Sequence, residues 1–217
     1  MNRFLFVVLL LLAPLVNILP TPAIAAPVGR ATAAFDNMRF DKTETAWGRL
    51  AADALQAATR ADLALLHAGV LNSGSLKAGA IESGDITALL AFPDDEVVTI
   101  TITGAQLRAG LERAVQAYPT GSRAFLHGAG FTAAFNTQAP TNRRITMVRV
   151  KGREVKDSDS FTVAMPVSLA EGGAGYYTIW NAQGAQRSRT TLGAAIVNFV
   201  RARGDITPDN APRVAPQ

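Results

Sequence analysis

A segment of alternating side chains, residues 97–103, constrains the fold of this chain more than any other stretch. Val98, Ile100 and Ile102 alternate with Val97 and three threonines, and this period of two is typical of a β-strand with one buried face. Upstream, the apolar run 63–66 predicts a second, buried strand that ends in a loop rich in glycine and serine, residues 69–79. The stretch 62–104 therefore predicts two strands separated by a loop that can carry binding groups.

Three helices are predicted from apolar residues that recur every three or four positions. The first follows a capping box at 41–44, the second begins at the capping box Thr103–Gln106, and the third runs from Thr191 to Gly204. Further short strands are predicted near 125–135, 145–150 and 161–167. This order of elements predicts an α+β domain in which helices pack against a mixed β-sheet.

The first residues are typical of a secretory signal peptide. Arg3 precedes an apolar run that Pro14 interrupts, and Ala23-Ile24-Ala25 forms a cleavage site, so cutting is expected after Ala25. We therefore expect a periplasmic or secreted protein without a membrane span once the signal is removed. The predicted organisation is a signal peptide (1–25), a lead-in segment (26–40), a folded domain (41–204) and a proline-containing disordered tail (205–217).

Charge and residue usage exclude several function classes. The formal net charge is +4, but the basic residues are scattered and do not interleave with aromatic ones, which argues against binding of nucleic acid. Cysteine is absent, which excludes disulfides and thiolate metal sites. The two histidines, His67 and His127, lack visible partner ligands, so hydrogen-bonded structural histidines are favoured over metal ligands. No catalytic residue, metal site or cofactor is predicted.

The loop 69–79, which follows the predicted strand 63–66, is the best candidate for a ligand pocket. Asn72 and Lys77 supply polar and charged groups there, and Gly74 allows close approach of a ligand to the backbone. Phe92, at a Phe-Pro corner, offers an aromatic face. Turns favour such polar residues in any case, so these residues alone do not identify a function.

Several motifs, in this order and at these spacings, resemble the C-terminal domain of the 5'-nucleotidase family, and the likeness extends over residues 41–203. The motifs are Glu44-x-x-Trp-Gly48-x-Leu50, Asn72-Ser-Gly-Ser-Leu-Lys77, Gly84-Asp85, Leu90-Ala-Phe-Pro93, Thr103-Gly104-x-x-Leu107 and Glu171-Gly-Gly-Ala-Gly-Tyr176.

The resemblance implies a nucleoside site in which the base is stacked between two aromatic rings, Phe92 and Tyr176. It also implies contacts from Asn72, Gly74 and Lys77 to the base and ribose. Lys77 stands where the family usually carries arginine, and Ala91 replaces a proline. Without the resemblance, the alternative that Phe92 and Tyr176 pack in the core remains open.

Enzymes of this family cleave phosphate esters at a two-metal centre in a separate N-terminal domain, and its ligand chemistry is missing here. The predicted function is an exported nucleoside- or nucleotide-binding domain. It would contribute to nucleotide hydrolysis only with a separately encoded metallophosphatase partner. Two alternatives remain open: a non-catalytic protein-interaction module with a vestigial nucleoside pocket, and a hydrolase with a site of its own.

Overall fold

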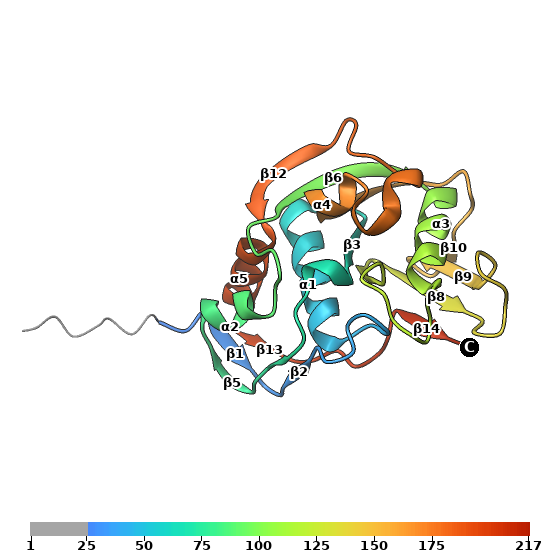
Figure 1. Cartoon of the computed structure of the whole chain (residues 1–217). Coiled ribbons are helices and arrows are strands. Elements are labelled where there is room, and N and C mark those ends of the chain that lie inside the picture. The colour runs from blue at the N-terminus through green and yellow to red at the C-terminus, as the bar shows by residue number, and fades with distance from the viewer. Residues whose placement is uncertain (1–25) are drawn as a thin grey trace, which may run out of the picture.

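The central sheet of the protein is built around its longest strand, β6 (Glu96–Thr103), in a computed structural model that describes residues 26–217 (Figure 1). The strand order is β12-β6-β11-β3-β7. The other strands of this sheet are β3 (Leu63–His67), β7 (Leu126–Ala129), β11 (Ser160–Pro166) and β12 (Gln186–Thr191). Val98, Ile100 and Ile102 are buried as the alternating pattern predicts, whereas Thr101 and Thr103 are exposed.

Both faces of the central sheet are covered, and this explains why residues 63–66 of β3 are all apolar. Ala64 and Leu66 point into one hydrophobic core, and Leu63 and Leu65 into the other. The first core contains helices α1 (Ala46–Thr59) and α5 (Leu192–Arg203), which lie side by side in Figure 1. The second contains α3 (Gly104–Val115), at the other end of the molecule. The predicted α+β class, a mixed sheet with packed helices, is confirmed.

The helix caps account for where the helices begin. Thr103 and Gln106 form the predicted capping box of α3, and Thr191 caps α5 by accepting a hydrogen bond from Ala194 N. For α1 the predicted cap at 41–44 is wrong, because Thr45 is the cap and accepts from Gly48 N.

The remaining elements form smaller sheets and short helices. A four-stranded sheet has the order β10-β9-β8-β14, a three-stranded one β13-β1-β5, and a two-stranded one β2-β4. The strands are β1 (Gly29–Ala31), β2 (Phe35–Asp36), β4 (Ser75–Leu76), β5 (Gly79–Ile81), β8 (Phe131–Phe135), β9 (Ile145–Val150), β10 (Arg153–Glu154), β13 (Asp205–Ile206) and β14 (Val214–Pro216). The helices are α2 (Ser83–Ala88), α4 (Val167–Ala170) and the 3-10 turns η1 (Ala68–Val70) and η2 (Gly173–Thr178).

Both ends of the described chain differ from the prediction. The segment 26–40 was predicted as a lead-in, yet β1 and β2 lie within it and pair with strands of the domain. The tail 205–217 was predicted to be disordered, and this is wrong, because β13 pairs with β1 and β14 pairs with β8. Ile206 and Val214 are buried. The burial of their apolar side chains offsets the conformational entropy that the tail loses when it becomes ordered.

A buried carboxylate, Glu44, connects the C-terminal strand to the start of α1. Its side chain accepts hydrogen bonds from the backbone N–H groups of Gly128, Arg213 and Val214. Burial raises the pKa of Glu44, while those three hydrogen bonds and the charge of Arg49 oppose the rise. The Arg213 side chain binds Asp53 through two hydrogen bonds of 2.7 and 2.9 Å.

Two expectations from the sequence concern the N-terminus and the membrane. The predicted signal peptide, residues 1–25, lies outside the described residues. Within 26–217, no helix combines the length and apolar character needed to cross a membrane.

Replacing Arg213 with alanine should destabilise the fold. The Arg213→Ala variant loses the paired contact to Asp53 and the hydrogen bond to Gly128 O, so we expect the free energy of unfolding to fall by about 2 kcal/mol. Urea unfolding followed by circular dichroism measures this change. The matched control is Arg201→Ala, because Arg201 is exposed and, within residues 26–217, its side chain bonds only Asn198. This variant should stay within about 0.5 kcal/mol of the parent. Equal stability of the two variants would contradict the role given to the tail.

Candidate functional site

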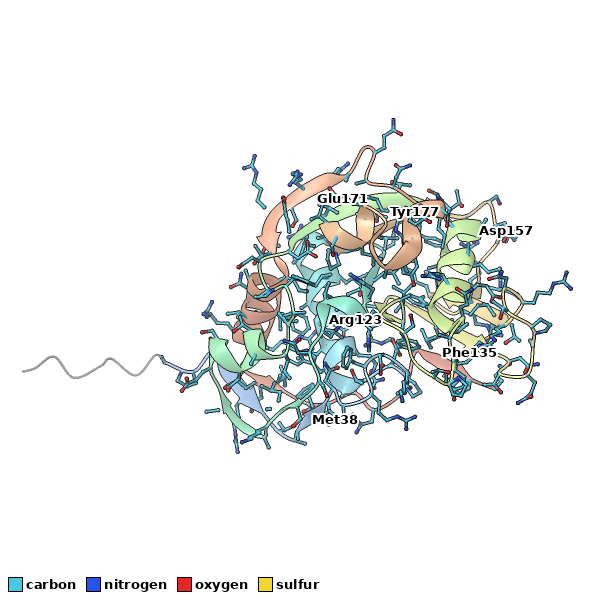
Figure 2. The ribbon with its side chains drawn as sticks, viewed as in Figure 1. Met38, Arg123, Phe135, Asp157, Glu171 and Tyr177 are labelled. Atoms are coloured by element: carbon cyan, nitrogen blue, oxygen red, sulfur yellow. The ribbon has the colours of Figure 1, made fainter. Side chains whose placement is uncertain are left out.

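All five strands of the central sheet have a terminus on the same side of the sheet, called the sheet edge below. Strands β3 and β11 are parallel and both terminate there, whereas β6 and β7 run antiparallel to them and begin there. This edge therefore gathers His67 at the end of β3, Ser168 after β11, Asp95 before β6 and Arg123 before β7. Ligands commonly bind beyond the carboxyl ends of neighbouring parallel strands. Figure 2 labels Arg123 and also Glu171, which follows α4.

Phe92 lines a hollow of about 480 Å³ at this edge. The other lining residues are Ala91, Pro93, Asp94, Asp95 and Ser168. Phe92 is 58 % exposed, so its ring does not belong to the core and much of its surface is open to a ligand. Of the two alternatives left open by the sequence for Phe92, the structure agrees with the exposed ring.

Asn72 positions the chain that leads to Phe92. Its side-chain amide donates two hydrogen bonds, to Ala88 O at 3.1 Å and to Leu90 O at 3.0 Å. In addition, Ala91 N donates to Val70 O, which holds the same segment from its other side. Because both hydrogens of the amide are engaged, Asn72 keeps only its side-chain oxygen for a ligand.

The other predicted loop residues do not reach the Phe92 hollow. Gly74 adopts a φ of +150°, and a Cβ atom there would come within 2.8 Å of Leu89 Cδ2, so glycine is required for the turn. Lys77 is exposed and lines a different hollow, of about 340 Å³, together with Asp85. The structure thus places Lys77 and Phe92 at separate surfaces.

Tyr176, predicted as the second stacking ring, is fully buried, and that prediction is wrong. Its ring stacks on Trp180 with a centroid distance of 4.8 Å, and its hydroxyl donates a 2.6 Å hydrogen bond to Ala124 O. Burial raises the pKa of the Tyr176 hydroxyl well above its ordinary value. The positive φ angles at Ala174 and Gly175 turn the chain so that Tyr176 points inward and Tyr177 outward.

Asp95 and Ser168 are contributors that the sequence did not reveal. Ser168 donates from its hydroxyl to Asp95 Oδ2 and from its backbone N–H to Asp95 Oδ1. Burial raises the pKa of Asp95, the bonds from Ser168 oppose that rise, and the nearby charge of Glu171 adds to it. Serine and aspartate beside strand ends are too common to signal a site, and only the pairing of β6 with β11 brings these two together.

His67 lies at the end of β3, as predicted, but its hydrogen bonding differs from the prediction. Its Nδ1 atom is buried and has no hydrogen-bond partner among residues 26–217. Burial lowers the pKa of His67 to about 4, and the charge of Arg123 acts in the same direction. Gly69 and Gly173 lie against the ring, since a Cβ at Gly69 would come within 2.8 Å of it and one at Gly173 within 3.9 Å.

His127 is a structural residue in the interior. It is fully buried beneath Gly48 of α1, and its Nε2 lies 2.9 Å from Phe40 O. Burial is the main cause that lowers its pKa to about 4. In the described part of the chain, no group of three or more histidine, aspartate or glutamate side chains is arranged to hold a metal ion.

The architecture and this sheet edge define a mixed α/β domain with a candidate ligand site, and comparison with known proteins identifies its family. A family model described as "5'-nucleotidase, C-terminal domain" matches residues 27–181, and the chain belongs to that family. The matched range includes most of the segment 26–40, in line with the pairing of β1 and β2. No curated protein sequence matches the chain.

Solved structures support the same fold at low sequence identity. A 5'-nucleotidase precursor from Thermus thermophilus superposes with a TM-score of 0.81 at 21 % identity, covering 88 % of this chain and 39 % of its own. NAD nucleotidase from Haemophilus influenzae gives 0.75 at 19 % identity, covering 88 % and 38 %. A putative 5'-nucleotidase from Staphylococcus aureus, in complex with alpha-ketoglutarate, gives 0.71 at 13 %, covering 88 % and 41 %. This chain thus spans about two fifths of each of those proteins.

The buried His67 should make stability depend on pH. Its folded pKa of about 4 lies below the ordinary value of 6.5, so the unfolded chain binds a proton that the folded chain does not. The free energy of unfolding should therefore fall as the pH drops from 6.5 toward 4, and His67 adds up to about 1.4 kcal/mol per pH unit to that slope.

Urea titrations of the parent and of His67→Gln between pH 4 and 7 would measure this contribution. His127 and the carboxyl groups are common to both proteins, so the difference between the two curves reports His67 alone. We expect the variant to have the shallower decline toward acid. Parallel curves would show that His67 is not buried in the neutral form.

Proposed function

We propose that this protein is an exported nucleoside- or nucleotide-binding domain whose ligand base stacks on Phe92. The observation that carries the proposal is a half-exposed aromatic ring over a hollow at the edge of the central sheet, in a domain of the 5'-nucleotidase family. Stacking on an aromatic ring is worth ~1–3 kcal/mol per base and tolerates different bases, because each base has a π face.

The polar groups around this ring fit the edge of a base. Asp95 accepts from Ser168 and lies in the same hollow, where its oxygens can also accept from an exocyclic amine. With Tyr176 in the core, stacking is from one side only, which favours weak binding.

Hydrolysis, in this proposal, requires a separately encoded metallophosphatase partner. A two-metal centre needs several convergent carboxylate and imidazole ligands, and the side chains of residues 26–217 do not supply such a group. The chain spans about two fifths of the nucleotidases that it resembles in fold.

A non-catalytic interaction module is the second candidate, and the placement of Tyr176 and Lys77 favours it. The resemblance put both residues around one ligand, yet Tyr176 is buried and Lys77 lines another hollow. In that case the nucleoside pocket would be vestigial and the exposed Phe92 would contact a protein instead.

Replacing Phe92 should separate the two functions. Calorimetric titration of the mature protein with adenosine, AMP and UDP-glucose should give binding in the millimolar range or tighter, and Phe92→Ala should weaken it by about 5- to 100-fold. Met38→Ala is the matched control, because Met38 is exposed to a similar extent (61 %) and does not line the Phe92 hollow. Absence of any binding by the parent, or an equal loss in both variants, would remove the nucleoside assignment and favour the interaction module.

Export can be tested by determining the N-terminus of the mature protein. Cleavage after Ala25 leaves Ala26 as the first residue, so intact-mass measurement on protein from the periplasm or medium should show loss of residues 1–25. An Ala25→Leu substitution should block this cleavage, because the cleavage site requires a small residue there. Unprocessed parent protein in the cytoplasm would contradict the proposed location.

A further inference from the structure

A second hollow, of about 500 Å³, lies between α3 and the turn η2. Its apolar wall is formed by Ala109, Ile179 and the ring of Tyr177, and its polar wall includes Arg113, Gln116 and Asn142. The volume is in the range typical of small-molecule sites, and its lining residues are different from those of the Phe92 hollow.

The Tyr177 ring is held out into solvent by a rigid backbone. Its side chain is 74 % exposed, more than those of Phe92 and Met38. Tyr177 N donates to Gly172 O, and a Cβ at Gly172 would come within 2.4 Å of Tyr177 Cα, so the two backbones are in close contact. The neighbouring Tyr176 is anchored in the core. The exposed ring therefore has a fixed base, which lowers the ordering cost of binding.

Arg113 presents a fixed positive charge beside that ring. Its Nε and Nη2 atoms donate to Ala174 O at 3.2 and 2.8 Å, and Nη1 donates to Gln116 Oε1 at 2.7 Å. A Cβ at Gly175 would come within 2.4 Å of Nη2, so the guanidinium packs against a position that only glycine accommodates. Among the described residues, Arg113 makes no salt bridge. Its charge is therefore available to an anion.

The carboxylate in this hollow is already engaged. Glu112 also lines the hollow, and its two oxygens accept hydrogen bonds from Arg144 N at 3.0 Å and from Ile145 N at 2.7 Å. These bonds orient the carboxylate toward the 144–145 backbone and offset its charge.

We propose that this hollow binds a small anion that carries a planar apolar group, such as an aryl phosphate or an aryl carboxylate. The ring of the ligand packs on Tyr177 and Ile179, and its anionic group contacts Arg113. The site depends on none of the groups around Phe92, so it stands independently of the proposed nucleoside binding.

Amide chemical shifts of the ¹⁵N-labelled mature protein would test this site. We expect titration with phenyl phosphate, and separately with benzoate, to move the amides of Gly175, Thr178 and Ile179 in a saturable way. Benzamidine has the same ring with a positive charge and should not move them, and inorganic phosphate lacks the ring and should bind more weakly. The stronger of the two aryl anions identifies which head group the site prefers.

Variants on both walls of the hollow make the test specific. Tyr177→Ala should weaken aryl-anion binding by about fivefold or more, since an aromatic contact is worth ~1 kcal/mol. Arg113→Gln should also weaken it, and Arg113→Lys should fall between that variant and the parent, because a lysine keeps the charge but loses the planar fork. The control Arg108→Gln lies on the same helix outside the hollow and should bind as the parent does.

The Tyr177→Ala variant tests the site even if Arg113→Gln disturbs the turn that Arg113 supports. Tyr177 is exposed, so its replacement leaves the core intact. Equal binding of benzamidine, shift changes confined to Phe92 and its neighbours, or unchanged affinity in Tyr177→Ala would each overturn the proposal. Phe92→Ala should leave aryl-anion binding unchanged, which separates failure here from failure of the nucleoside site.

Discussion

The burial of Glu44 is the constraint on which the arrangement of this domain depends. A carboxylate removed from water is tolerated only where hydrogen bonds replace its hydration, and here three backbone N–H groups do so. Those groups come from β7 and from the C-terminal segment, while Glu44 itself precedes α1. One side chain thereby joins the first helix, an edge strand of the central sheet and the last strand of the chain. Arg213 extends this connection by binding Asp53 on α1.

The candidate site follows from the direction of the strands in the central sheet. Because β3 and β11 are parallel and their antiparallel neighbours start at the same edge, loops distant in sequence converge there. The result is a one-sided aromatic platform, Phe92, with acceptor groups beside it. The second exposed ring, Tyr177, lines a different hollow that contains Arg113 and the hydrogen-bonded Glu112, whereas Asp94 and Asp95 lie beside Phe92.

The spacing of apolar residues was sufficient to predict the strands and helices that bury one face. The strand 97–103, the caps Thr103 and Thr191, and the α+β class are all confirmed, because each depends on local chemistry. The tail was misjudged because its order comes from partners far away, including Asp53 and Glu44, which no local pattern reveals. Tyr176 was misjudged for a related reason. The two adjacent tyrosines point in different directions, and the positive φ angles before them decide which one faces outward.

The hydrogen bond between Glu44 and Arg213 N spans 169 positions in the chain, and this has a consequence for the order of assembly. A ribosome releases the N-terminal part of a protein first, and local helices can form as they emerge. Glu44, however, lacks two of its three donors until residues 213 and 214 are free. Burying it earlier would leave a desolvated carboxylate underbonded, which is unfavourable. Closure of this domain therefore waits for residues 213 and 214, and a chain interrupted before them leaves Glu44 without two of its three donors.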